Sequence, residues 1–524
     1  MPDRPTTRHP APGRTAHRTA PRLWQWAVAL AVATAALRLL LGALLPPFPD
    51  ETYYWEWSRH LAWSYFDHPP LIAWLIRGGT QLLGTHVLGI RLLSILAGLV
   101  TVLAGIATAR RMAGDAAALR ASAIIACVPL AAAGLVLATP DLPLMAATAL
   151  ALYAVVRAVQ DPRRALLWWL AAGAATGLGL LGKYTAVLIP LGVLAGLLWD
   201  PRLRGQLRRP GPYLAALAAL ALFLPVVAWN AHHDWASFAF QLNHGLGRPR
   251  GNPLSREGDL IGGQLGLGSP ILFVLMWIAV IRGLRHAPPG LATGDAARTG
   301  STGDPGPRGA RNDAAHSVLA ATAVVFFGFF MLSALRRPVE PNWPAPFYVP
   351  GTVLLAIEAG RGGLRRWLRP GLALGAVLVA VVYVQAVRPI LPIRSSRDPI
   401  DRAHGWATLA RAVQRAEPPD GPVTFAATRY QEASELSFHL PGHPFVHSLN
   451  RLGRRNQYDL WPPIDTRLRP AMPVIVVAAC DTQPGALLAA YPRLGTLTAS
   501  DRVRLPGRRG IVRERCIYRF RVGG

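Results

Sequence analysis

Long apolar runs, separated by short polar segments, constrain this sequence more than any other feature. A helix of about 20 apolar residues crosses the roughly 30 Å of hydrocarbon in a bilayer, and most of the runs approach that length. Of the 524 residues, 52% are hydrophobic and only 16% are charged, which argues against a soluble enzyme. The runs therefore predict a polytopic α-helical membrane protein. We expect about eleven transmembrane helices, at residues 23–45, 87–109, 117–136, 142–159, 165–182, 184–200, 211–230, 269–284, 315–335, 344–359 and 370–388.

The basic residues indicate which helix ends face the cytoplasm. Of the 55 lysines and arginines, all but Lys183 are arginine, and most fall in alternate loops. Cytoplasmic loops carry such an excess, so we expect the N-terminus inside and the C-terminus outside. This segregation explains the net charge of +27 without a nucleic-acid partner. The arginines expected inside are Arg4, Arg8, Arg14, Arg18, Arg22, Arg110, Arg111, Arg157, Arg163, Arg164, Arg202, Arg204, Arg208, Arg209, Arg361, Arg365, Arg366 and Arg369.

The remaining sequence divides around the membrane part. Residues 1–22 are expected to form a disordered cytoplasmic tail, and residues 23–389 a transmembrane domain with a first periplasmic loop at 46–86. Residues 286–314 are rich in Gly, Pro, Ala and Thr without any period, which is typical of a flexible cytoplasmic loop. Residues 390–524 contain short β-type runs and the helical pattern QEASELSFHL, so they predict a small periplasmic α/β domain.

The three cysteines are too few for a disulfide scaffold and lack metal-ligand spacing. Cys127 lies in an apolar run. Cys480 and Cys516 lie in two predicted strands of the external domain, where an oxidising compartment would allow a bridge. The sequence leaves open whether these two cysteines are bridged or free.

The first periplasmic loop concentrates acids and aromatics. It reads PPFPDETYYWEWSRHLAWSYFDHPPLIAWLIRGGTQLLGTH, with Asp50 and Glu51 at the end of the first span and Asp67 and His68 further on. One interpretation is an amphipathic interfacial helix whose tryptophans form an aromatic belt. The other is a catalytic site, in which a carboxylate takes the proton from an acceptor hydroxyl as that hydroxyl attacks a sugar carbon. Adjacent acids at a helix end favour the second interpretation.

Several segments carry a family resemblance. PDETYYWEWSRHLAWSYFDHPPL resembles the first periplasmic loop of bacterial glycosyltransferase family 39 proteins, which are similar to the protein O-mannosyltransferases and the lipid A aminoarabinose transferases. GLGLLGKYTAVL, PNWPAPFY, RYQEASELSFHLPG and RRNQYDLWPP resemble this group as well. The resemblance implies the C-type glycosyltransferase fold and a polyprenyl-phosphate-linked sugar donor, with undecaprenyl phosphate as the carrier.

The resemblance also implies roles for residues of the first loop. Asp50 matches the proposed catalytic base and Glu51 the second acid of the same motif, while Tyr54 is expected to contact the substrate. Asp67 matches an acidic position that is usually followed by Lys, and here the next residue is His68. An imidazole can bond a phosphate or a metal, but its charge at neutral pH is not assured.

The resemblance further raises the possibility of a divalent metal. In relatives an ion can bridge the first-loop acid and a later histidine, so Asp67, His232 and His233 are candidate ligands. Carboxylate and imidazole together favour zinc. A histidine cluster at a helix end is more often an interfacial cap, so both interpretations stay open.

Basic residues expected outside are few. A lipid phosphate needs cationic partners, and Lys183, Arg336 and Arg337 lie at predicted outer helix ends. The competing interpretation of the arginine pair is snorkelling at the interface. Asp141, in the loop ATPDLP, is expected to cap the following helix.

The sequence thus predicts a multi-pass inner-membrane glycosyltransferase that moves a sugar from a polyprenyl phosphate to a lipid or protein acceptor in the cell envelope. Two alternatives remain, a transporter or flippase for lipid-linked sugars and a non-catalytic binder of such lipids. A transporter would be expected to place acids near the bilayer midplane, whereas these acids gather at one face. The sugar, the acceptor, the anomeric outcome and the oligomeric state do not follow from the sequence.

Overall fold

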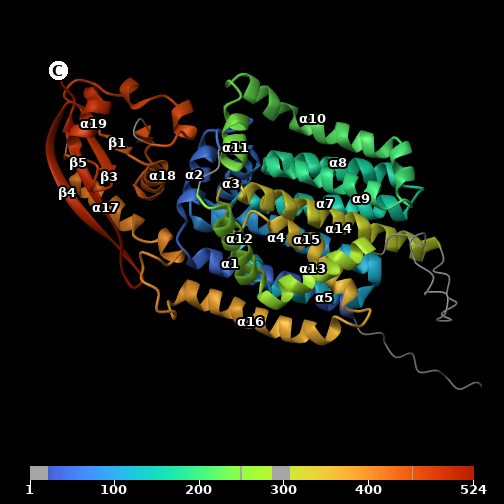
Figure 1. The fold of residues 1–524 in the computed structure, drawn as a ribbon. Helices are drawn as coiled ribbons and strands as arrows, with labels where there is room; N and C mark the ends of the chain where they lie inside the picture. The colour runs from blue at the N-terminus through green and yellow to red at the C-terminus, as the bar shows by residue number, and fades with distance from the viewer. Residues whose placement is uncertain (1–21, 248–250, 286–306, 420, 451–452, 524) are drawn as a thin grey trace, which may run out of the picture.

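The computed structural model describes residues 22–247, 251–285, 307–419, 421–450 and 453–523. A helical part, running from α1 to α16, is followed by a smaller part built around a β-sheet, which lies at one end of the helices (Figure 1). The predicted fold class, a polytopic helical protein with a small C-terminal α/β unit, is confirmed.

Within these described ranges, seven helices are long and apolar enough to cross a membrane, and two further helices that form a bent pair would make an eighth crossing if they count as one span. The pair is α12 (Pro253–Gly268) and α13 (Pro270–Arg285), which meet at 103°. Ser269, between them, has a left-handed φ of 62° and precedes a proline, which ends α12. The seven helices are α1 (Leu23–Leu44), α4 (Val87–Ala113), α7 (Asp141–Gln160), α8 (Ala165–Gly182), α10 (Gly211–Ala231), α14 (Pro307–Ala334, with the apolar span at Asn312–Ala334) and α16 (Arg365–Val387).

The expected count of eleven spans is therefore not confirmed. The predicted span at 117–136 is broken into α5 (Asp115–Ala126) and α6 (Pro129–Gly134), because Val128, before a proline, is extended. Three further apolar helices have fewer than 18 residues. They are α3 (Leu71–Leu83), η1 with α9 (Tyr184–Val187 and Leu188–Trp199) and η4 with α15 (Ala345–Phe347 and Tyr348–Glu358).

Two predicted flexible segments lie wholly or mainly outside the described residues. These are the tail, of which only Arg22 is described, and residues 286–306 of the cytoplasmic loop. The rest of that loop, 307–314, is helical and begins α14, so that part of the prediction was wrong. The Asn312 side chain anchors this part of the chain to its neighbours. It accepts a hydrogen bond from Gln160 at 2.6 Å and donates one to the Met112 carbonyl at 3.2 Å.

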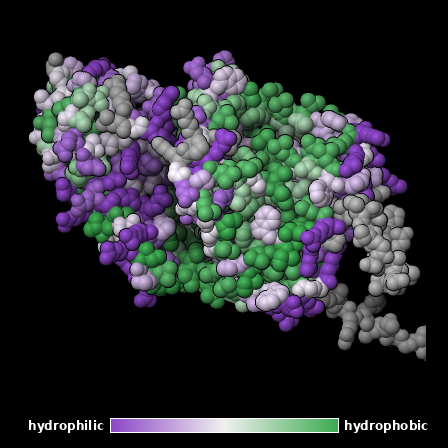
Figure 2. All heavy atoms as spheres, viewed as in Figure 1, coloured by the Kyte–Doolittle hydropathy of each residue, from purple (hydrophilic) through white to green (hydrophobic). Residues whose placement is uncertain are grey.

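The outer surface of the helical part is apolar. Figure 2 shows hydrophobic residues over most of the helices in this view and hydrophilic residues over much of the C-terminal part. Large side chains such as Leu198 of α9 and Leu217 of α10 are exposed, as expected of lipid-facing positions. The chain is accordingly a multi-pass membrane protein.

The C-terminal part holds a five-stranded sheet in the order β2-β1-β3-β5-β4. β1 pairs in parallel with β2 and β3, and β5 pairs antiparallel with β3 and β4. The predicted helix QEASELSFHL is α18, whereas α17, α19 and β4 were not predicted. The bounds are β1 (Thr424–Ala427), β2 (Val446–Ser448), β3 (Pro473–Ala478), β4 (Thr496–Gly507), β5 (Gly510–Arg521), α17 (Trp406–Ala416), α18 (Tyr430–His439) and α19 (Pro484–Ala490).

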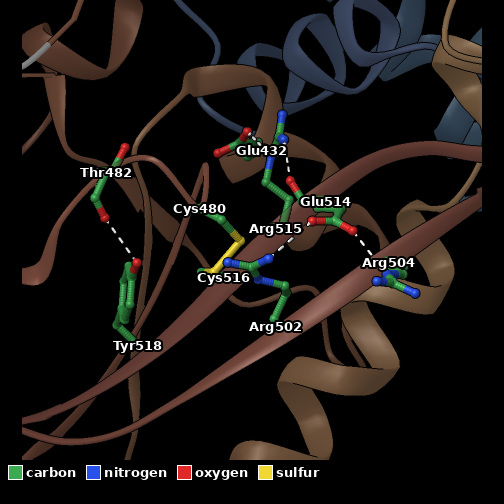
Figure 3. The surroundings of a disulfide bond; sticks show 9 residues. All are labelled: Glu432, Cys480, Thr482, Arg502, Arg504, Glu514, Arg515, Cys516 and Tyr518. Carbon is green, nitrogen blue, oxygen red and sulfur yellow. Dashed lines mark hydrogen bonds and ion pairs between the residues drawn. A yellow bond between two sulfur atoms is a disulfide. The ribbon is translucent and has the colours of Figure 1, made fainter.

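A disulfide joins Cys480, just after β3, to Cys516 of β5, with 5.0 Å between their Cα atoms (Figure 3). The two strands are neighbours in the sheet, and Ala478 pairs directly with Cys516. The bridge considered from the sequence is therefore present in the structure.

The C-terminal part packs directly on α2 (Pro49–Arg59), the helix that begins the first loop. The hydroxyls of Thr52 and Ser434 are 3.1 Å apart, and Ser437 donates to Glu56 at 2.9 Å. Because these contacts are buried, the first loop and the C-terminal part lie at the same end of the helical bundle.

Candidate active site

Glu51, in the first turn of α2, is buried, and both oxygens of its carboxylate accept hydrogen bonds. Arg91 of α4 donates to it through Nε at 2.8 Å and through Nη2 at 2.5 Å. The backbone N–H groups of Ala138 and Phe48 donate to the same carboxylate at 2.8 and 3.0 Å. Arg91 gives further hydrogen bonds to three backbone carbonyls in the last turn of α1 and just after it. This geometry favours a structural role for Glu51 over the catalytic role that the resemblance implies.

Asp50, one residue earlier, has a contrasting environment. Its side chain is exposed, and it has no hydrogen bond or ion pair with any residue that the structure describes. Partial loss of hydration raises the pKa of Asp50, while the positive charges of Arg402 and Arg454 oppose that shift. An unpaired carboxylate with a raised pKa can accept a proton, as a general base requires.

Asp67 lies in a polar network that joins three parts of the chain. Its Oδ2 accepts from Tyr53 at 2.6 Å, and its Oδ1 forms an ion pair with Arg454 of the C-terminal part. Its backbone carbonyl accepts from Gln241 of α11 (Ala236–Leu246). Asp67 is thus positioned by bonds from the first loop, α11 and the C-terminal part.

His68 is half-buried, and its Nδ1 has no hydrogen-bond partner among the described residues. Burial holds the pKa of His68 well below its usual value, and the nearby positive charge of Lys183 adds to this effect. This shift disfavours the cationic form of His68 that a phosphate ligand would need.

Tyr54 connects these groups. Its ring lies 6.1 Å from that of His68 and is buried. Burial raises the pKa of Tyr54, and the carboxylates of Asp50 and Asp67 raise it further. The structure therefore brings Asp50, Tyr54, Asp67 and His68 together, as the sequence predicted.

Lys183 follows α8 and approaches the same region. Its Nζ donates to Asp141 at 2.6 Å, and Asn342 donates to the other oxygen of Asp141 at 2.8 Å. The ammonium also lies 5.8 Å from the ring centroid of Trp343. Asp141 therefore holds Lys183 in place, which is more than the capping role expected from the sequence.

The predicted arginine pair divides into one exposed and one half-buried residue. Arg336 is exposed, whereas Arg337 is half-buried and its charge lowers the pKa of His244. Arg454 and Lys183 act on His244 in the same direction, although burial is the larger cause of that shift. Arg337, Lys183 and Arg454 thus all place positive charge near His244, and Lys183 and Arg454 act on His68 as well.

The candidate metal ligands are not brought together. His232 and His233 line a pocket of about 530 Å³ with Phe66, Phe240 and Arg455. Asp67 is engaged by Tyr53 and Arg454 instead. Across the described ranges, no group of three His, Cys, Asp or Glu side chains is arranged to hold a metal ion. This donor set does not fit the predicted zinc ion.

Sequence reasoning missed the contribution of the C-terminal part. Tyr430 lies 4.4 Å from Tyr53 between ring centroids, and Gln457 bonds both Tyr53 and Phe66. Arg454 and Gln457 belong to the segment RRNQYDLWPP, which marked the resemblance without indicating a role for either residue.

Comparisons with known proteins show what this chain is similar to. Residues 67–229 match the family model described as dolichyl-phosphate-mannose-protein mannosyltransferase. The lipid A galacturonosyltransferase RgtD of Rhizobium johnstonii is 29% identical over 308 residues, which cover 59% of each chain. An undecaprenyl phosphate-alpha-4-amino-4-deoxy-L-arabinose arabinosyl transferase of Pseudomonas aeruginosa is 34% identical over 215 residues, 37% of this chain and 39% of that protein. The aligned part of the chain thus spans less than two thirds of either relative.

The fold has a solved counterpart. ArnT from Cupriavidus metallidurans, in a crystal structure bound to undecaprenyl phosphate, aligns with a TM-score of 0.64 and 16% identity. The alignment covers 94% of this chain and 98% of ArnT. The likeness shows a shared fold from the first helix to the C-terminal sheet.

Proposed function

We propose that this protein is a membrane glycosyltransferase of family 39. Residues 67–229 match a mannosyltransferase family model, and the chain has an ArnT-like fold. It transfers a sugar from a polyprenyl-phosphate donor to an acceptor at the outer face of the membrane. One relative is named as a lipid A galacturonosyltransferase, and another is named for a sugar carried on undecaprenyl phosphate. Undecaprenyl phosphate and an envelope lipid acceptor are the substrates that these names support.

The observation that supports the proposal is the contrast between two adjacent acids at the start of α2. Glu51 is held by four hydrogen bonds, whereas Asp50 is exposed and unpaired among the described residues. A carboxylate in that state is available to a hydroxyl group of an acceptor. Asp50 is therefore our candidate for the catalytic base.

The reaction is a single displacement at the anomeric carbon. Asp50 accepts the proton of the acceptor hydroxyl while its oxygen forms a bond to that carbon. The bond from the same carbon to the phosphate oxygen breaks, and the polyprenyl phosphate leaves with the electron pair. Lys183, Arg337 and Arg454 lie close enough to the site to stabilise the phosphate charge.

The orientation follows from the same site. The donor sugar and the acceptor meet at the end of the bundle that carries α2 and the C-terminal part, and the arginine-rich loops lie at the other end. By the positive-inside rule, the C-terminal part is periplasmic and the N-terminus is cytoplasmic.

A transporter of lipid-linked sugars shares one feature with this fold, the bent pair α12 and α13. Alternating-access transporters pair such broken helices around acids at the midplane. In this protein Asp50 and Asp141 lie instead in the first turns of α2 and α7, and Asp67 lies in the loop between α2 and α3. We therefore prefer the transferase.

The experiment is a reconstituted assay of the purified protein with undecaprenyl-phosphate-linked sugars, paired with mass spectrometry of envelope lipids from a deletion strain. A lipid that loses one sugar mass in the deletion strain identifies both sugar and acceptor. Transfer of that sugar by the purified protein supports the proposal. Movement of the lipid across vesicles without sugar transfer would overturn it in favour of a transporter.

A further inference from the structure

We propose that Arg454, supplied by the C-terminal part, binds the phosphate of the sugar donor and so makes that part a component of the active site. This inference rests on the proposed function, because the ligand is the donor of that reaction.

The first support is the position of the guanidinium. Arg454 forms an ion pair with Asp67, and its Cζ lies 4.6 Å from the ring centroid of Phe240 of α11. It also lies 5.8 Å from the ring centroid of Tyr430 of α18. The side chain therefore lies where the first loop, α11 and the C-terminal part meet.

The backbone that follows Arg454 is fixed to the same site. The side-chain amide of Asn456 donates to the Arg454 carbonyl at 3.0 Å. The next residue, Gln457, donates its backbone N–H to the Tyr53 hydroxyl at 2.7 Å, and its side chain accepts from the Phe66 N–H at 2.7 Å. These bonds hold the Arg454 backbone against the first loop before any ligand binds.

The second support is that Arg454 keeps binding capacity. A guanidinium has five N–H donors, and Nη2 is the donor that bonds Asp67. About half of the side-chain surface, 47%, is exposed although its partner Asp67 is almost fully buried. The free edge can form the two parallel hydrogen bonds that arginine makes with phosphate.

Lys183 and His68 are less available than Arg454. Lys183 is only 11% exposed and its ammonium is bonded to Asp141. Burial lowers the pKa of His68, which disfavours its cationic form. Of these three residues, Arg454 is therefore the most exposed, and it is already bonded to the first loop through Asp67.

The third support is the link between Arg454 and the proposed base. The charged and titratable groups that act on Asp50 are Arg402, Glu51, Arg454 and Glu340, and Tyr54 and Tyr430 lie nearby. The positive charge of Arg454 opposes the rise that burial causes in the pKa of Asp50. The same charge adds to the lowering that burial causes in the pKa of His68. One residue thus acts on the base and on the proposed phosphate site.

The test compares Arg454→Gln and Arg454→Lys with the wild-type protein in the reconstituted assay. Arg411→Gln is the matched control, because Arg411 lies on the exposed face of α17 and bonds only within its own helix. We expect Arg454→Gln to raise the KM for the donor by about 10- to 150-fold, as loss of a charged hydrogen bond does. Arg454→Lys should recover part of the loss, since it keeps the charge without the planar fork.

A second readout separates binding from mere structural support. Loss of the Arg454 charge should move the acidic limb of the kcat/KM profile to higher pH, because the positive charge no longer favours the Asp50 carboxylate. The double variant Asp67→Asn/Arg454→Gln removes the buried carboxylate left unpaired in the single variant. If only misfolding caused the defect, the double variant would regain wild-type donor affinity.

The outcomes distinguish the two proposals. Absence of sugar transfer by the wild-type protein would sink the proposed function, whatever Arg454 does. An active wild type with an unchanged donor KM and an unchanged acidic limb in Arg454→Gln would overturn this inference alone. Undecaprenyl phosphate binding, measured without turnover, should weaken in Arg454→Gln and remain at the wild-type level in Arg411→Gln.

Discussion

Arg91 holds Glu51 through two hydrogen bonds of 2.8 and 2.5 Å, and both side chains are almost completely buried. Because Arg91 also bonds carbonyls in the last turn of α1 and just after it, the pair ties the end of that helix to the start of α2. This connection fixes the backbone on which the preceding acid, Asp50, is presented to solvent. The two neighbouring acids therefore have separate tasks, one structural and one chemical.

The first prediction concerns this ion pair. Arg91→Gln leaves the Glu51 carboxylate buried without its cation, and breaking a buried pair in this way costs about 3 to 5 kcal/mol. Thermal unfolding in detergent should show a much lower midpoint for Arg91→Gln than for Asp50→Asn, which removes no contact. Equal midpoints for the two variants would contradict the structural role of Glu51.

The second prediction is topological. Reporter fusions after residues 240 and 420 should both be periplasmic, and fusions near residue 300 should be cytoplasmic. The buried contact between Thr52 and Ser434 requires the first loop and the C-terminal part to share one side. A cytoplasmic report at residue 420 would invalidate the orientation.

The third prediction concerns the disulfide between Cys480 and Cys516. The bridge closes a loop of 36 residues in sequence separation, so its removal by Cys516→Ser should destabilise the C-terminal part by about 2 to 4 kcal/mol. Alkylation of the unreduced protein should label Cys127 alone. Labelling of all three cysteines before reduction would show that the bridge is absent.

The fourth prediction is a pH dependence that arises from Glu435 of α18. Burial raises the pKa of this carboxyl from 4.5 to about 7, against the opposing charges of His439 and Arg513. The folded protein then holds a proton that the unfolded chain releases near pH 4.5. The protonated carboxyl therefore contributes to the free energy of unfolding. This contribution, about 3 kcal/mol, is complete below pH 4.5 and is lost as the pH rises through about 7.

Unfolding midpoints measured from pH 5 to pH 8.5 should therefore fall with rising pH in the wild-type protein. Glu435→Gln stays neutral throughout and should flatten that part of the curve. Parallel curves for the two proteins would show that Glu435 does not titrate in this range.

Much of the fold was predictable because a bilayer requires long apolar helices, and such helices are visible in the sequence as runs of apolar residues. The span at 117–136 was misjudged because hydropathy does not detect the break caused by Pro129. The helix α3 was hidden within a loop identified by its acids and aromatics. Apolar length alone does not determine whether a helix crosses, bends or lies at the surface.

The site was predictable only where its residues are close in sequence. Asp50, Tyr54, Asp67 and His68 all come from one loop, and the structure brings them together. The partner of Asp67 is Arg454, 387 residues later, and no periodicity or spacing links two such positions. For the same reason, the ion pair between Glu51 and Arg91 could be identified only from the structure.

Asp50, as the proposed base of a sugar transfer from a lipid phosphate, is tested most directly by the turnover of Asp50→Asn with the lipid-linked donor in the reconstituted system, measured together with donor binding. We expect a loss of about 10² to 10⁴ in turnover with donor binding and thermal stability unchanged, because the variant keeps the size of the side chain and removes the base. Wild-type turnover by Asp50→Asn would contradict this role of Asp50.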